Sequence, residues 1–102
     1  MAYARAAVRY AKSIIQLSIE QDSLELVKSD MDLIRATCAE SKELVLLLQS
    51  PVVKADKKLA VLNAVFGSKL SDLTKNFINI LTNKGRESLI NDISFAFEDQ
   101  YL

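Results

Sequence analysis

The sequence of 102 residues contains no histidine, no tryptophan and a single cysteine, Cys38. These counts exclude an intrachain disulfide, a zinc site built from cysteine and histidine, and the Ser-His and Cys-His pairs of hydrolases. The two glycines, Gly67 and Gly85, stand 18 positions apart, so the chain has no glycine-rich loop that would hold a phosphate. We therefore expect no catalytic residues, no metal and no cofactor.

Neither sign of charge is in excess, because 13 lysines and arginines balance 13 aspartates and glutamates. Proteins that bind nucleic acid usually gather basic residues on one face, so this balance argues against such a partner. The longest apolar run, residues 44–48, is far shorter than the roughly 20 residues of a membrane-crossing helix. The start of the chain lacks the order of a secretion signal, which favours a cytosolic face and a reduced Cys38.

Because half of its residues are apolar, the chain is expected to fold as one domain spanning residues 1–102. Apolar residues recur at spacings of three and four throughout, and β-branched residues never accumulate with a period of two, which predicts helices and no strands. The predicted fold class is all-α, a compact bundle of six short helices. The expected helices span residues 2–20, 22–39, 41–50, 54–66, 71–84 and 87–101.

A few residues are expected to mark the helix ends. Asp22, with Glu25 three positions later, fits a capping box at the start of the second helix. Ser41 is expected to cap the third helix. Gly67 and Gly85 are expected to end the fourth and fifth helices in the left-handed conformation.

Apolar residues that share one face of each expected helix form the candidate core. Cys38 lies on such a face, and we interpret it as a small core residue in preference to a reactive thiol, because no histidine or basic cluster is present to lower its pKa. The candidate core comprises Leu24, Val27, Met31, Ile34 and Cys38 on the second helix, Ala55, Leu59, Leu62, Val65 and Phe66 on the fourth, Leu70, Phe77 and Leu81 beside and on the fifth, and Ile90, Ile93, Phe97 and Tyr101 on the sixth.

The polar side chains of the first helix occupy a strip of only about 100°, so apolar groups cover more of this helix than one buried stripe requires. The edge expected to face the core comprises Ala7, Ala11, Ile14 and Ile15. The other edge, expected to contact a further helix, comprises Ala6, Tyr10, Ser13 and Leu17. Burial of the whole helix at the centre of the domain stays open as the alternative.

The fifth helix mixes apolar and amide side chains along one edge. This edge comprises Leu73, Asn76, Ile80 and Asn83. An apolar anchor flanked by amides is suited to a groove that binds a helix and fixes its register. An ordinary solvated border is the alternative, and both interpretations remain open on these residues alone.

Several short segments together resemble the N-terminal domain of the delta subunit of F-type ATP synthase, called the oligomycin-sensitivity-conferring protein in mitochondria. The resemblance covers nearly the whole chain and keeps the order and spacing of the segments, which are specific only in combination. The segments are Tyr10-Ala11-Lys12, Ser50-Pro51-Val52, Lys57 to Val61-Leu62 with Phe66-Gly67, Asn76-Phe77-Ile78 to Leu81, and Lys84-Gly85-Arg86.

This resemblance implies a non-catalytic, six-helix domain at the top of the enzyme, where it joins the catalytic head to the peripheral stalk. It also implies that the N-terminal amphipathic helix of an alpha subunit binds in a groove between the first and fifth helices. Carried over by position, the groove residues are Tyr10, Ser13, Asn76, Ile80 and Asn83, on the two edges described above. Ser13 departs mildly from the family, which commonly has a small alanine there.

The family has a second, C-terminal domain that binds the b subunits of the stalk. Because the chain ends at Leu102 before that domain, we expect it to be part of a longer subunit. No transit peptide precedes Tyr3, which favours a bacterial source and a peripheral position at the cytoplasmic face of the inner membrane.

Two other functions remain as alternatives. One is a generic helical adaptor that binds an amphipathic helix of another partner. The other is nucleic-acid binding through Arg5, Arg9 and Lys12, although zero net charge favours a solvated strip there. Catalysis by paired carboxylates is disfavoured because Asp30 and Asp32 are two positions apart on a helix and point in different directions.

Overall fold

The computed structural model describes residues 3–102, and over these residues the chain is helical with no strand. This confirms the predicted all-α bundle of six helices. Two short 3₁₀ turns, η1 (Gly67–Lys69) and η2 (Glu87–Leu89), precede the last two helices. The helices are α1 (Arg5–Glu20), α2 (Leu24–Glu40), α3 (Lys42–Gln49), α4 (Ala55–Phe66), α5 (Asp72–Asn83) and α6 (Ile90–Tyr101). The first helix begins at Arg5 rather than at residue 2, which lies outside the described residues.

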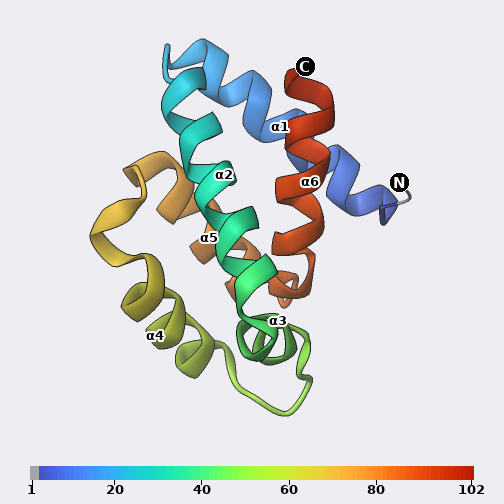
Figure 1. Cartoon of the computed structure of the whole chain (residues 1–102), viewed down its shortest axis with the longest axis vertical. Coiled ribbons are helices and arrows are strands. Elements are labelled where there is room, and N and C mark those ends of the chain that lie inside the picture. Colours follow the sequence, from blue (N-terminus) through green and yellow to red (C-terminus); the bar gives the residue numbers. More distant parts are fainter. Residues whose placement is uncertain (1–2) are drawn as a thin grey trace.

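The helices α2 and α6 lie side by side, and α1 crosses one end of this pair (Figure 1). The short helices α3 and α4 lie at the end away from α1, and α5 packs against α4 and α2. This arrangement places the first and last helices in contact, so α1 is held mainly by α6.

One core runs through the bundle and includes a residue from every α-helix. On α1 the buried side chains include Ala7, Ala11 and Ile14, as predicted, and Ile15 is partly buried. The two alanines are fully buried, and their small size lets the backbone of α1 approach α6 closely. The core residue Cys38 is also buried, which confirms its predicted place.

Three helix ends lie where the sequence predicted them, at Ser41, at Gly85 and before Pro51. The hydroxyl of Ser41 accepts a hydrogen bond from the backbone N–H of Leu44 at 3.2 Å and so caps α3. Gly85 has a φ of +74°, and the bonds from its own N–H to the Thr82 carbonyl and from Arg86 N–H to the Leu81 carbonyl end α5 in a Schellman motif. The third helix also stops where Pro51 follows.

The predicted capping box at Asp22 is wrong. Asp22 lies outside α2 with a φ of +55°, and Ser23 occupies the N-cap position, where its side chain accepts no capping hydrogen bond. The Asp22 N–H donates to the Ile19 carbonyl and the Ser23 N–H to the Ser18 carbonyl, so Asp22 closes α1 instead. The link between α1 and α2 is so short that one residue must reverse the chain in the left-handed region, which aspartate tolerates.

Two expectations for α4 also need correction. Gly67 follows the helix as predicted, but its φ is +15°, and it starts the turn η1 instead of adopting the left-handed C-cap. Ala55 is exposed, whereas Lys58 is buried among the core-facing residues of this helix. Lys58 is buried because its ammonium group finds three acceptors inside the fold, the carbonyls of Leu48 and Ser50 and the carboxylate of Glu87.

Candidate functional site

The second edge of α1 is open to solvent, so burial of the whole helix is ruled out. Leu17 keeps 37% of its surface exposed, and Ser13 is exposed as well. Ala6 and Tyr10 are half-buried on the same edge. The helix therefore has one edge in the core and one edge that no described residue covers completely.

The predicted edge of α5 is also accessible. Ile80 is 53% exposed although it is a large apolar residue, and it lies between the exposed Asn76 and Asn83. Leu73 is partly buried and packs against the core. A single exposed apolar residue on a small domain needs no explanation. Ile80, however, belongs to an edge on which apolar and amide side chains are mixed at helical spacing.

Tyr10 connects the two helices. Its ring meets the ring of Phe77 on α5 edge to face, with the centroids 6.2 Å apart. Phe77, which was expected in the core, is partly buried and packs against the core. On its other side the Tyr10 hydroxyl accepts a hydrogen bond from Arg86, whose guanidinium carbon lies 5.9 Å from the centre of the ring.

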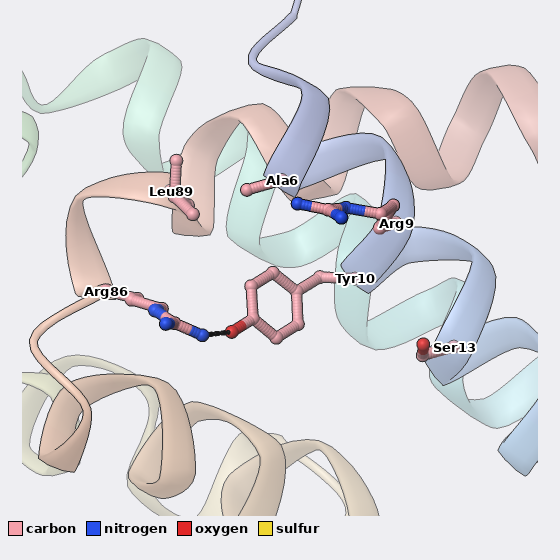
Figure 2. Close-up of a pocket in the computed structure, with 6 residues that line it drawn as sticks. All are labelled: Ala6, Arg9, Tyr10, Ser13, Arg86 and Leu89. Atoms are coloured by element: carbon pink, nitrogen blue, oxygen red, sulfur yellow. Dashed lines mark hydrogen bonds between the residues drawn. The ribbon is translucent and has the colours of Figure 1, made fainter.

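A hollow of about 470 Å³ opens beside Tyr10 (Figure 2). It is lined by Ala6, Arg9, Tyr10, Ser13, Arg86 and Leu89. The structure thus brings together three of the predicted site residues of α1. The other predicted residues, Leu17, Leu73, Asn76, Ile80 and Asn83, do not line this hollow.

Sequence reasoning missed Arg9, Arg86 and Leu89 as lining residues of this hollow. Arg9 was assigned to the solvated strip of α1, but it borders the hollow from the same helix as Tyr10. Arg86 lies in the turn after α5, where no helical periodicity indicates a direction. Leu89 lies in the 3₁₀ turn η2, because the sixth helix begins at Ile90 and not at residue 87 as predicted. The only signal was Gly85, whose left-handed conformation ends α5 and reverses the chain just before Arg86.

The thiol of Cys38 and the carboxylates of Asp30 and Asp32 do not line the hollow beside Tyr10. Burial raises the pKa of the Cys38 thiol to about 11, so Cys38 is protonated at neutral pH. Asp30 accepts hydrogen bonds from Ser71 and Thr74, whereas Asp32 pairs with cations on the surface of α2. The two carboxylates therefore point in different directions, as predicted.

Residues 3–102 contain no group of three histidine, cysteine, aspartate or glutamate side chains that would hold a metal ion. Over the same residues, every helix is too short or too polar to cross a membrane. The open edges of α1 and α5, with the hollow beside Tyr10, form the candidate site.

The family match and the similar known proteins all point to one family. Residues 6–102 match the family described as ATP synthase delta (OSCP) subunit. The chain is 40% identical over 97 residues to ATP synthase subunit delta of Cytophaga hutchinsonii, which covers 95% of this chain and 53% of that protein. It is 38% identical over 93 residues to the chloroplastic ATP synthase delta chain of Chlamydomonas reinhardtii, covering 90% of this chain and 42% of that protein. The chain spans about half the length of the curated relatives it matches, and it belongs to the ATP synthase delta (OSCP) subunit family.

Proposed function

We propose that this chain is the N-terminal helical domain of a delta-type peripheral-stalk subunit and that it binds the N-terminal amphipathic helix of an ATP synthase alpha subunit. The role is structural and not catalytic. The proposed binding groove comprises Ala6, Tyr10, Ser13 and Leu17 on α1 and Leu73, Asn76, Ile80 and Asn83 on α5. The observation that carries the proposal is the pair of open edges on α1 and α5, with Leu17 and Ile80 exposed, joined by the contact of Tyr10 with Phe77.

The chemistry of the groove suits a helix. Leu17 and Ile80 offer exposed apolar surface, which an apolar stripe of the partner would remove from water. Asn76 and Asn83 offer amide groups beside it that fix the register. A helix brings backbone groups that are already hydrogen-bonded, so its burial costs little polar desolvation.

Within the synthase, such a contact would act as part of the stator. Rotation inside the catalytic head exerts a torque on the head, and a fixed attachment at its top would resist that torque. A helix at the end of a flexible segment suits this task because it stays bound while the head changes conformation. The domain itself needs only rigidity and a groove, which the single continuous core supports.

The rest of the subunit and its location follow as parts of the same proposal. A second, C-terminal domain would bind the b subunits of the stalk. The proposal includes a peripheral position at the cytoplasmic face of a bacterial plasma membrane. Relatives from bacteria accord with such a source, and a chloroplastic relative matches as well. No direct insertion into the membrane and no nucleic-acid partner are part of this proposal.

A titration of the isotope-labelled chain with a synthetic peptide of the alpha-subunit N-terminus tests the groove by NMR. The largest amide shift changes are expected at Tyr10, Ser13, Ile80 and Asn83. A peptide of the same composition in scrambled order serves as the control. Shift changes confined to the outer faces of α2 and α6 would overturn the proposed groove, and equal binding of an unrelated amphipathic helix would favour a generic adaptor.

A further inference from the structure

The hollow beside Tyr10 contains two arginines and no carboxylate among its lining residues. Arg9 reaches it from α1 and Arg86 from the turn after α5, and Figure 2 shows their side chains on two sides of the Tyr10 ring. Ser13 adds a hydroxyl at the rim, and Ala6 and Leu89 supply apolar surface. The hollow is therefore positively charged, with an apolar wall.

The backbone of Arg86 is held by the turn after α5, and its exposed side chain uses few of its donors within the described residues. Its backbone N–H donates to the Leu81 carbonyl at 2.8 Å, and its own carbonyl accepts from Leu89 N–H at 3.1 Å. The side chain gives one hydrogen bond to the Tyr10 hydroxyl, and the guanidinium group carries five N–H donors. A guanidinium group with unused donors can bind a carboxylate in bidentate fashion.

The acidic residue nearest to Arg86 in the sequence, Glu87, does not pair with it. Glu87 is buried and pairs with Lys58, so it does not neutralise its neighbour. The other ion pairs between described residues lie on α2, α5 and α6 and involve neither Arg9 nor Arg86. Two guanidinium groups around one hollow without an anion would be stabilised by a negative charge brought from outside.

We propose that the hollow is a carboxylate subsite of the groove, which receives one glutamate or aspartate side chain of the docked helix. This inference rests on the proposed function and specifies the partner: its helix carries an acid at the position that reaches Arg86. The carboxylate accepts hydrogen bonds from Arg86 and Arg9, and the methylenes of a glutamate pack on Ala6 and Leu89. A side chain of a docked helix is the occupant because the hollow shares Ala6, Tyr10 and Ser13 with the groove.

Such a subsite would determine how the partner lies in the groove. Apolar contacts alone allow a helix to slide by a turn or to reverse its direction. An acid that must meet one fixed guanidinium at the end of the groove allows a single register and direction. Helices that carry lysine at this position would be rejected by the two arginines.

A double-mutant cycle tests the subsite. The affinity of the alpha-subunit peptide is measured by calorimetry for the parent chain and for Arg86→Gln, and then for peptides in which each acid is replaced singly by its amide. We expect one acid-to-amide peptide to bind about tenfold more weakly to the parent. The affinity of that same peptide should fall almost no further when the chain carries Arg86→Gln. The affinity of each other peptide should fall about tenfold on the same substitution.

Two variants serve as controls. Lys84→Gln removes an exposed charge two residues from Arg86 and should change affinity less than twofold. Tyr10→Phe removes the acceptor of the Arg86 hydrogen bond but keeps the ring, and it tests whether Arg86 acts only by holding Tyr10. If Tyr10→Phe matched Arg86→Gln, and if the loss were the same for every peptide, Arg86 would be merely structural and the subsite would be refuted.

Other outcomes separate this inference from the function on which it rests. If the parent peptide binds the groove and all acid-to-amide peptides bind equally well, the subsite is wrong and the groove stands. If the parent peptide does not bind the chain at all, both proposals are wrong.

Discussion

Lys58 and Glu87 form an ion pair in the interior of the domain, although 29 positions separate them in the sequence. Lys58 is only 2% exposed, and its ammonium group also donates to the backbone carbonyls of Leu48 at 3.1 Å and Ser50 at 2.7 Å. One side chain of α4 thus ties together the end of α3 and the turn η2. Because η2 begins next to Arg86, this pair also anchors one end of the candidate site.

Replacing Lys58 by methionine should lower the free energy of unfolding by about 3–5 kcal/mol, because Glu87 and two carbonyls would remain buried without their donor. Chemical denaturation followed by circular dichroism measures this change. The double variant Lys58→Met with Glu87→Leu should recover much of the loss, since it removes both charges. Lys57→Met, at an exposed position of the same helix, is the control. Equal stability of Lys58→Met and Lys57→Met would contradict the argument.

The core makes a second prediction. Ile34 on α2 is 1% exposed, so Ile34→Ala should lower stability by roughly 2–5 kcal/mol through the cavity it creates. Leu46→Ala removes an aliphatic side chain of the same size that is 65% exposed, and it should change stability by less than about 1 kcal/mol. Thermal unfolding of the chain as a cooperative helical domain provides the measurement. Similar losses for the two variants would mean that Ile34 is not in the core.

The helices and their buried faces were predictable because they depend on local spacing. The face of α2 with Val27, Met31 and Ile34 follows the periodicity of a helix and is buried throughout. The cap at Ser41 and the left-handed Gly85 depend on a few neighbouring residues. Such local patterns predict helices, their buried faces and their caps without knowledge of where the helices lie relative to one another.

Contacts between distant segments were not predictable in the same way. Lys58 is buried only because α3 and η2 supply its acceptors, which no pattern within α4 reveals. Asp30 on α2 likewise accepts hydrogen bonds from Ser71 and Thr74 at the start of α5, 41 and 44 positions later. The place of Arg86 in the candidate site depends on the packing of the turn after α5, so a helical wheel assigns it no direction.

The buried thiol makes stability depend on pH. Burial raises the pKa of Cys38 from 9.0 to about 11, so the folded chain holds this proton more tightly than the unfolded chain. The stabilising effect is complete below pH 9 and is lost as the pH rises from about 9 to about 11, because only the unfolded thiol ionises in that range. Urea denaturation at a series of pH values should show this decline.

Cys38→Val isolates the contribution of the thiol, since valine has a similar size and no ionisable group. The decline between pH 9 and pH 11 should be shallower in this variant, while the titration of the tyrosines is common to both proteins. A thiol reagent supplies an independent check, because the folded parent should react far more slowly at pH 8 than the urea-unfolded parent. Identical pH profiles for the parent and Cys38→Val would refute the assignment.

The groove makes the last prediction, which concerns affinity for the alpha-subunit peptide. Tyr10→Ala and Ile80→Ala should each weaken binding by roughly 1–3 kcal/mol, because they remove the aromatic and the aliphatic anchor of the two edges. Asn76→Ala should cost less, since water replaces an exposed amide. Lys12→Ala, on the polar strip of α1, is the control and should leave the affinity unchanged.

Calorimetry at two salt concentrations completes this test. A groove with apolar edges and a single charged subsite should give a shallow dependence on salt, in contrast to the steep dependence of a protein that contacts many phosphates. Unchanged melting of Ile80→Ala would verify that its effect is on binding, which its 53% exposure leads us to expect. If Lys12→Ala weakened binding more than Tyr10→Ala and Ile80→Ala, the polar strip of α1 would be the binding surface and the groove would be rejected.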